Sequence, residues 1–184
     1  NGNVAEKIAF ECSCLQKKCG ACALVINGRP KLGCDARLND LGAFIKVEPI
    51  RKFNTICDLI VDRSILFENL KTLKLWLEDD AKINEKRRSL LYKASECIQC
   101  GLCLEVCPNF CNDNKFFGMN ATILTTRLLS ELDPVDRKII AKLYQTHCYN
   151  GCAKSLACKD VCPRKIKTDE MLVNANLLAI WKTK

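Results

Sequence analysis

Cysteine is the residue type through which this chain is best equipped to do chemistry. The 184-residue sequence contains 15 cysteines, and most of them fall into three groups separated by short gaps. Because 15 is an odd number, the cysteines cannot all pair within one chain. Gaps of two and three residues also suit metal ligation better than disulfide loops. We therefore expect reduced thiolates that bind metal in a reducing compartment.

The first group has successive gaps of four, two and eleven residues and consists of Cys14, Cys19, Cys22 and Cys34. A gap of two lets one tight loop aim neighbouring sulfurs at the same centre, and a distant fourth ligand closes the cage. The opening spacing matches the plant-type [2Fe-2S] pattern, although the fourth cysteine comes earlier than in those ferredoxins. Gly20 lets backbone N–H groups approach the inorganic sulfur. Cys12 is an alternative ligand to Cys14.

The second and third groups each end in a Cys-Pro pair, as bacterial ferredoxin runs do. The second group is Cys97, Cys100, Cys103 and Cys107. The third group is Cys152, Cys158 and Cys162, and aligning it with the second places Ser155 where a further cysteine is due. In two-cluster proteins the last cysteine of each run ligates the other cluster. This exchange predicts a [4Fe-4S] cluster on Cys97, Cys100, Cys103 and Cys162, and a [3Fe-4S] cluster on Cys107, Cys152 and Cys158.

Two alternatives to this assignment stay open. Zinc also binds thiolates, commonly through two Cys-x2-Cys pairs, but it needs neither a third cysteine at a gap of two nor the Cys-Pro ending. Ser155 could in principle ligate iron and complete a four-iron cluster in the third group. Analysis of iron and acid-labile sulfide separates zinc from a cluster.

Short strands are expected to position the first group. Residues 23–26, the pair Asn27-Gly28 and residues 29–34 predict a tight hairpin, although Pro30 weakens its second strand. Residues 45–48 alternate apolar and charged side chains, as a half-buried strand does. Two or three short strands make a poor domain on their own. We therefore expect residues 1–53 to be part of a small strand-and-loop domain whose earlier segment is missing.

Helices are expected to position the other two groups. Asn54 can cap a helix whose apolar residues recur at gaps of three and four as far as Leu73. The same pattern predicts a helical segment at 90–94, a helix from Asn120 to Glu131, one from Pro134 to Gln145, and a terminal one from Thr168 to Thr183. Residues 54–184 are therefore predicted to form an all-helical second domain.

The net charge of +8 does not indicate a nucleic-acid partner. The basic surplus divides evenly between the two halves, and the run Lys86-Arg87-Arg88 is typical of a solvated helix face. Three clusters with their thiolates contribute about −6, which leaves the assembled protein near +2. Apolar runs such as 177–181 are far shorter than the roughly 20 residues needed to cross a bilayer. We expect neither nucleic-acid binding nor a transmembrane segment.

With these motifs in order, the chain resembles the iron-sulfur subunit of succinate dehydrogenase and fumarate reductase over essentially its whole length. The matching segments are Cys14-x4-Cys19-Gly20-x-Cys22-x11-Cys34, Pro30 to Cys34, Asp58 to Asp62, Cys97 to Cys103, and Cys152-x5-Cys158-x3-Cys162-Pro163. The resemblance implies an α+β fold. An N-terminal β-grasp, [2Fe-2S] ferredoxin-like domain at 1–53, incomplete at its start, precedes a C-terminal all-α helical ferredoxin domain at 54–184.

The resemblance also implies an electron-transfer function. In this family a separate flavoprotein subunit interconverts succinate and fumarate at FAD, and single electrons pass through [2Fe-2S], [4Fe-4S] and [3Fe-4S] clusters to a quinone held against membrane anchor subunits. The chain itself then contains no catalytic residue. It lies peripherally, through its partners, on the inner side of a bacterial cytoplasmic or mitochondrial inner membrane. An iron-sulfur carrier that serves another flavoprotein, or acts as a free ferredoxin-like protein, is the alternative.

The sequence departs from ubiquinone-linked members at the quinone end. Those members place a Trp just beyond the first Cys-Pro and a His after the first cysteine of the last run, where this chain has Asn109-Phe110 and Ala153. A menaquinone-linked fumarate reductase, or a complex without a quinone, fits better. His147, the only histidine, precedes Cys152 by five residues, so a role near an acceptor is weighed against an ordinary surface role.

Four cysteines lie outside the predicted ligand sets, namely Cys12, Cys57, Cys111 and Cys148. A buried free cysteine behaves as a small hydrophobe, and we expect this of most of them. Cys111 and Cys148 each lie four positions from a predicted [3Fe-4S] ligand. Their spacing raises the hypothesis that they approach one another at the acceptor end and are both shielded.

Overall fold

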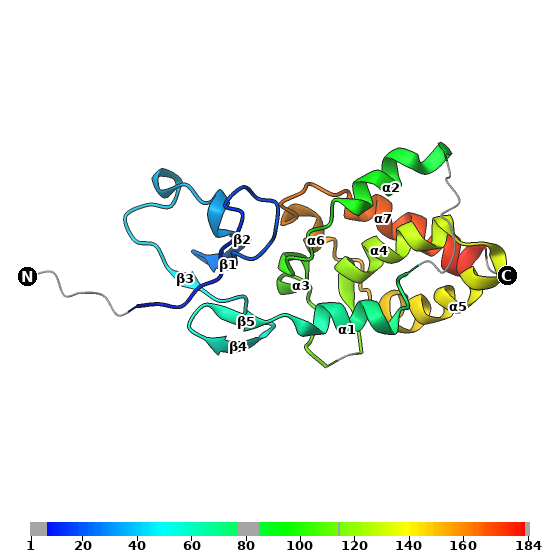
Figure 1. Ribbon diagram of the computed structural model, residues 1–184, viewed down its shortest axis with the longest axis horizontal. Helices are drawn as coiled ribbons and strands as arrows, with labels where there is room; N and C mark the ends of the chain where they lie inside the picture. Colours follow the sequence, from blue (N-terminus) through cyan, green and yellow to red (C-terminus); the bar gives the residue numbers. More distant parts are fainter. Residues whose placement is uncertain (1–6, 77–84, 114, 183–184) are drawn as a thin grey trace, which may run out of the picture.

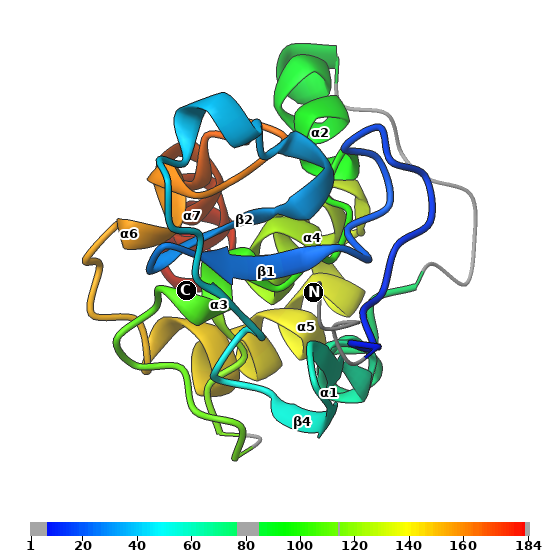
Figure 2. The same cartoon turned by 90° about the vertical axis from the view of Figure 1, so that its left-hand side faces the viewer.

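The computed structural model describes residues 7–76, 85–113 and 115–182 and has two parts arranged along one long axis. Figure 1 shows small sheets and long loops at one end and a group of helices at the other. Figure 2, which looks along the long axis from the β end, shows β1 and β2 lying across the helices. The first cysteine group belongs to the β part, and the second and third belong to the helical part.

A tight hairpin forms the centre of the β part, as the sequence predicts. Strands β1 (Ala23–Ile26) and β2 (Arg29–Leu32) pair antiparallel, and β3 (Val47–Glu48) adds to the other edge of β1. Asn27 and Gly28 adopt φ angles of 49° and 76°, the positive values that a two-residue turn of this kind requires. The Asn27 side chain also donates to Leu41 O and accepts from Lys46 N, which fastens the loop between β2 and β3.

The helix predicted from Asn54 is wrong over its first nine residues, which form a second hairpin. Strands β4 (Asn54–Cys57) and β5 (Ile60–Asp62) pair antiparallel around Asp58, whose φ is 44°. Apolar residues at 56, 59 and 60 have helical spacing, but the β-branched residues of this short run favour the strand. The hairpin lies beyond the predicted domain boundary at 53/54, so residues 54–184 are not all-helical.

Helix α1 (Ser64–Thr72) begins directly after β5, where Asp62 Oδ1 accepts from Ser64 N at 2.8 Å. The remaining helices are α2 (Arg88–Ser95), α3 (Leu102–Glu105), α4 (Gly118–Glu131), α5 (Pro134–Tyr144), α6 (Ala157–Asp160) and α7 (Thr168–Asn176). Single π-helical turns follow α5 and α7 at Gln145–Tyr149 and Leu177–Trp181.

Helix α4 is the central element of the helical part and packs against α1, α2, α3, α5 and α7. Asn120 does not cap it, because the helix begins at Gly118 and Asn120 is buried in its first turn. Pro134 does begin α5, and the Asp133 side chain accepts from Val135 N and Asp136 N as an N-cap. No helix in the described ranges is long and apolar enough to cross a membrane.

One apolar core joins the β part to the second cysteine group. It includes Val25 and Ile50 from the β part together with Leu102 and Phe110, all nearly or fully buried. A Cβ on Gly101, whose φ is +82°, would lie 2.9 Å from Phe53 Cζ. The two parts therefore share packing, and their relative placement is fixed by it.

Candidate metal centres

The first cysteine group lies on a loop whose backbone N–H groups point at its sulfurs. Cys14 Sγ accepts from Gln16 N and Lys18 N, both at 3.3 Å, and Cys34 Sγ accepts from Lys17 N at 3.4 Å. Cys22 Sγ accepts from Cys34 N at 3.4 Å. Such donors stabilise thiolate and sulfide charge. The loop therefore has the donors that a thiolate-bound cluster needs.

The two ends of this group differ in their electrostatics. Hydrogen bonds from the backbone of Gln16 and Lys18 lower the pKa of Cys14 to about 7, whereas burial raises the pKa of Cys34. Cys12 is exposed. These contacts favour Cys14 over Cys12 as a ligand, and the choice between them stays a prediction.

A first hollow in the helical part, of about 370 Å³ and partly open to solvent, gathers four of the predicted ligands. Cys97, Cys100 and Cys103 line it from the segment before and within α3, and Cys162 lines it from the end of α6. Burial raises the pKa of Cys100 to about 11 and raises that of Cys103 well above its usual value. The last cysteine of the third run thus lies with the first three cysteines of the second run.

A second hollow, of about 430 Å³ and also partly open, gathers the other three. Its lining includes Cys107, Cys152 and Cys158, and Ser155 borders the same space. The exchange of last cysteines that the sequence predicts is therefore matched by how the side chains are grouped. Which inorganic group each hollow holds stays a proposal.

The chemistry of both hollows suits a cluster of several metal atoms. Sulfurs line them together with mostly apolar residues, and polar groups contact the sulfurs at their edges. Ile166 N donates to Cys162 Sγ at 3.4 Å, and the Thr168 hydroxyl lies 3.7 Å from Cys158 Sγ. Within the described ranges, no three His, Cys, Asp or Glu side chains are grouped as ligands of a single metal ion.

The first loop touches the second group directly. A Cβ on Gly20 would lie 2.9 Å from Cys100 Cβ and 3.0 Å from Ile98 O, so only glycine allows this approach. Thr168 in turn lines the first hollow and contacts Cys158 of the second. The three cysteine groups therefore follow one another along the molecule.

Sequence analysis missed Arg63, which fixes the first loop from the start of α1. Its guanidinium donates to Gly20 O at 2.9 Å and Ala21 O at 2.8 Å and also pairs with Glu11. The side chain is only 15% exposed. A lone Arg after a strand carries no sequence signal for this role.

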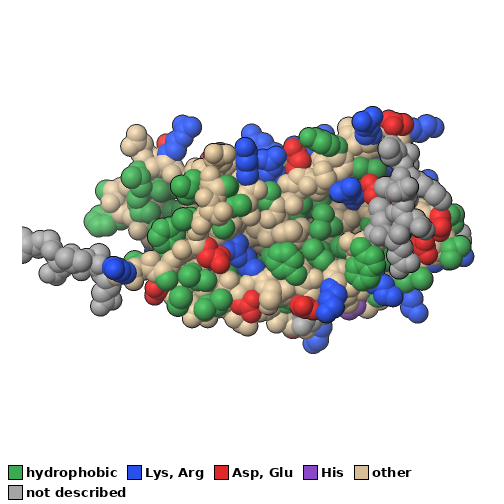
Figure 3. All heavy atoms as spheres, viewed as in Figure 1, with side chains coloured by type: hydrophobic (Ala, Val, Ile, Leu, Met, Phe, Trp, Pro, Cys, Tyr) green, Lys and Arg blue, Asp and Glu red, His purple; other side chains and the backbone are tan. Residues whose placement is uncertain are grey.

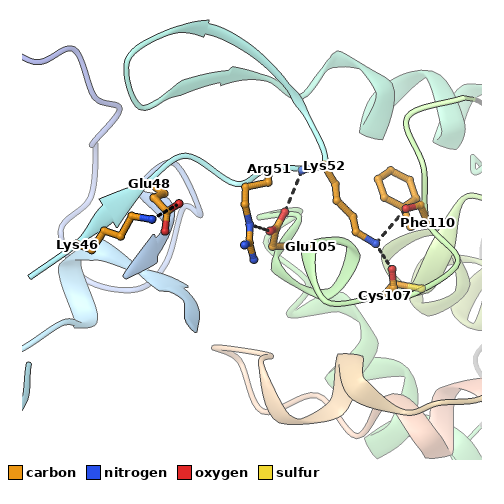
Figure 4. A network of polar contacts seen from close by, with 7 residues as sticks. All are labelled: Lys46, Glu48, Arg51, Lys52, Glu105, Cys107 and Phe110. Atoms are coloured by element: carbon orange, nitrogen blue, oxygen red, sulfur yellow. Dashed lines mark hydrogen bonds and ion pairs between the residues drawn. The ribbon is translucent and has the colours of Figure 1, made fainter. Parts of the chain in front are cut away.

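Sequence analysis also missed a polar network at the junction of the two parts (Figure 4). Glu105, which is 5% exposed, accepts from Arg51 Nε and Lys52 N, both at 3.0 Å. The Lys52 amine donates to Phe110 O at 3.1 Å and to Cys107 O. The network holds the backbone of a predicted ligand, Cys107, against the β part.

Other residues that the sequence analysis considered have ordinary surroundings. The His147 ring stacks on Phe117 at 4.3 Å between centroids, and its Nδ1 lies 3.2 Å from Lys115 O. Cys148 is fully buried, which raises its pKa to about 12, whereas Cys111 is exposed. The hypothesis that Cys111 and Cys148 are both shielded is therefore wrong for Cys111 in this chain. Cys57 and Cys12 are likewise exposed, so the prediction that most of the cysteines outside the ligand sets are buried is wrong.

Family models match both parts of the chain. The model of the 2Fe-2S iron-sulfur cluster binding domain matches residues 1–68, and that of the 4Fe-4S dicluster domain matches residues 93–166. The first match extends through β4 and β5, beyond the predicted boundary at 53/54. An N-terminal 2Fe-2S ferredoxin-like domain is thus followed by a helical 4Fe-4S ferredoxin region.

Curated relatives and a solved structure agree with these domains. The succinate dehydrogenase iron-sulfur subunit of Bacillus subtilis is 38% identical over 64% of this chain and 49% of its own length. The 8-methylmenaquinol:fumarate reductase iron-sulfur subunit of Wolinella succinogenes is 27% identical over 94% of this chain and 59% of its own length. The chain therefore spans between half and three-fifths of these two relatives.

A chain of the Mycobacterium smegmatis Sdh1 complex in the apo form superposes with a TM-score of 0.80 and 26% identity, over 97% of this chain and 80% of that one. By these two cluster domains, the named relatives and this structure, the chain is similar to the iron-sulfur subunits of succinate dehydrogenase and fumarate reductase.

Proposed function

We propose that this chain relays single electrons between the FAD of a flavoprotein subunit and a quinone in a fumarate reductase or succinate dehydrogenase complex. One observation carries the proposal. The three predicted ligand sets lie in series, because the Gly20 loop touches Cys100 and Thr168 bridges the two hollows. When bound, iron-sulfur clusters supply one-electron acceptors and donors at these three places.

The chain's own residues would hold these groups and set their surroundings. Cys14, Cys19, Cys22 and Cys34 would ligate a [2Fe-2S] cluster, Cys97, Cys100, Cys103 and Cys162 a [4Fe-4S] cluster, and Cys107, Cys152 and Cys158 a [3Fe-4S] cluster. Backbone N–H groups of the first loop stabilise sulfur charge. Mostly apolar residues line the two hollows of the helical part around the cysteine sulfurs.

Exposed apolar side chains at the β end support a partner protein there. Leu38 and Phe44 are 74% and 93% exposed, and Ile45 and Val47 follow on the same loop. Figure 3 shows apolar side chains gathered over this end of the molecule. Exposed apolar groups of this kind mark interaction sites. In our proposal the flavoprotein covers this end, next to the first cysteine group.

The opposite end of the series is proposed to serve a menaquinone held by membrane anchor subunits. The stretch after Cys107-Pro108 has no Trp of the kind that ubiquinone-linked members place there, and its Phe110 is 1% exposed and belongs to the core. Asn109 instead donates to Gly151 O at 2.6 Å. Through these partners the chain would lie peripherally on the inner side of an energy-transducing membrane.

Anaerobic purification of the tagged chain from its native host tests this function. We expect a flavoprotein that contains FAD to copurify from the membrane fraction, and we expect succinate to reduce clusters in the complex. Fumarate should reoxidise them. Recovery of the chain alone from the soluble fraction, with clusters that succinate leaves oxidised, would instead identify a free ferredoxin-like carrier.

A further inference from the structure

The glutamine inside the second cysteine run contacts one of the predicted ligands. Gln99 Nε2 donates to Cys97 Sγ at 3.1 Å, a short separation for a bond to sulfur. The φ of Gln99 is 51°, so the tight turn of the cysteine run itself brings this side chain back over Cys97. This hydrogen bond joins a side-chain amide directly to a predicted ligand sulfur.

A second amide, from a different element, holds Gln99 in this position. Asn120 Nδ2, in the first turn of α4, donates to Gln99 Oε1 at 3.1 Å. Asn120 is 1% exposed and lines the same hollow as Cys97. The two amides form a chain, Asn120 to Gln99 to Cys97, that runs from the core of the helical part to the sulfur.

The two amides donate in one direction, toward the sulfur of Cys97. Asn120 Oδ1 is buried and has no hydrogen-bond partner among the described residues. Leaving a buried acceptor unpaired costs about 1–3 kcal/mol. Turning both amides round would aim Gln99 Oε1 at Cys97 Sγ, and a ligand thiolate offers no proton to that oxygen. A thiolate at Cys97 therefore selects the orientation in which Gln99 donates.

From this arrangement we infer that Gln99, fixed by Asn120, sets the reduction potential of the cluster at Cys97, Cys100, Cys103 and Cys162. The inference rests on the proposed function, since it requires a cluster in the first hollow. An N–H donor stabilises charge on sulfur more when the cluster carries one more electron. Gln99 therefore raises the reduction potential of this cluster. It acts through the cluster and contacts no substrate.

Redox titration of the anaerobic holoprotein, followed by EPR, tests the inference in a Gln99→Leu variant. We expect the ratio of reduced to oxidised [4Fe-4S] cluster at a fixed ambient potential to fall roughly tenfold, which for a one-electron couple is about 59 mV. The [2Fe-2S] cluster of the same sample should keep its potential and serves as an internal reference. A matched control is Gln145→Leu, at an exposed position on the π-helical turn after α5, which should leave both potentials unchanged.

Gln99→Glu is a near-isosteric second variant that keeps the test decisive if Gln99→Leu assembles without its cluster. A carboxylate accepts but does not donate, so the [4Fe-4S] potential should fall further than in Gln99→Leu. A full iron content with an unchanged [4Fe-4S] potential in either variant would overturn the inference while leaving the proposed function intact. Absence of iron and sulfide from the unmodified chain would instead remove the proposed function itself.

Discussion

At the scale of single residues, the exchange of last cysteines makes opposite predictions for two similar substitutions. Cys162 lines the hollow of Cys97, Cys100 and Cys103, although the other two cysteines of its run, at 152 and 158, line the other hollow. Cys162→Ser should therefore lose or alter the [4Fe-4S] EPR signal of the reduced protein and retain the [3Fe-4S] signal of the oxidised protein. Cys107→Ser should do the reverse. If each substitution affected the cluster of its own run, the exchange would be refuted.

Ser155 decides the iron content of the second hollow. It borders this hollow with Cys107, Cys152 and Cys158, at the place where the second run has its middle cysteine. Ser155→Cys supplies a fourth thiolate, so iron should rise from about nine to about ten atoms per chain. The EPR signal of the oxidised [3Fe-4S] cluster should disappear, and Ser155→Ala should retain it. Loss of that signal in Ser155→Ala would instead show that the serine oxygen matters for the cluster.

At the scale of elements, the junction of β5 and α1 is predicted to hold the first cysteine loop through Arg63. Arg63→Met leaves Gly20 O and Ala21 O without their donor, which should cost about 2 kcal/mol. An iron chelator should then remove the [2Fe-2S] cluster about tenfold faster, as its absorbance shows. Arg29→Met, at the exposed start of β2, is the matched control and should leave this rate unchanged. Equal rates for both variants would exclude this role of Arg63.

The sequence predicted how the cysteines are grouped more completely than it predicted the helices and strands that carry them. Local signals sufficed for the Asn27-Gly28 hairpin and for the start of α5 at Pro134, because each depends on a few adjacent residues. The hairpin at 54–62 was missed because the few apolar residues of so short a run have helical spacing. Asn120 was taken for a cap because its amide partner, Gln99, is distant in sequence.

Contacts between distant residues also explain what was missed at the candidate site. Arg63 reaches the first loop across more than 40 positions, and Lys52 reaches Cys107 O across 55. A single Arg or Lys has no periodicity that marks it as a partner of a cysteine loop. The repeated Cys-x2-Cys gaps, in contrast, confine several ligands to one turn of chain, so the sequence alone shows that they act together.

At the scale of the whole molecule, the close approach of Gly20 to Cys100 should govern electron transfer between the first two clusters. Gly20→Ala places a Cβ 2.9 Å from Cys100 Cβ and must move the two loops apart. Electron transfer from [2Fe-2S] to [4Fe-4S] should slow although both clusters remain, as rapid-freeze EPR after a short reducing pulse can measure. Gly28→Ala has a similar positive φ with nothing within 4 Å of its Cβ, and it should leave this rate unchanged.

The junction network should act on the same whole-molecule arrangement through stability. Glu105→Leu removes the buried acceptor of Arg51 Nε and Lys52 N, and the loss of these bonds should cost about 2 kcal/mol. We expect a lower midpoint of denaturation for the holoprotein, followed by circular dichroism. Glu68→Leu, whose carboxylate makes only a loose pair with Lys71 at 4.0 Å, is the control and should unfold as the unmodified chain does. An unchanged midpoint in Glu105→Leu would show that the network does not join the two parts.

The central claim is that the predicted cysteines hold three iron-sulfur clusters. Low-temperature EPR of the anaerobically purified chain, first oxidised and then reduced, tests it most directly when the number of spins per chain is compared with the iron and sulfide content. Three clusters on the predicted cysteines require about nine iron and ten sulfide atoms per chain. The oxidised sample should show one [3Fe-4S] signal, and reduction should add one spin each from [2Fe-2S] and [4Fe-4S]. Zinc without sulfide, or cysteines joined as disulfides, would contradict the account.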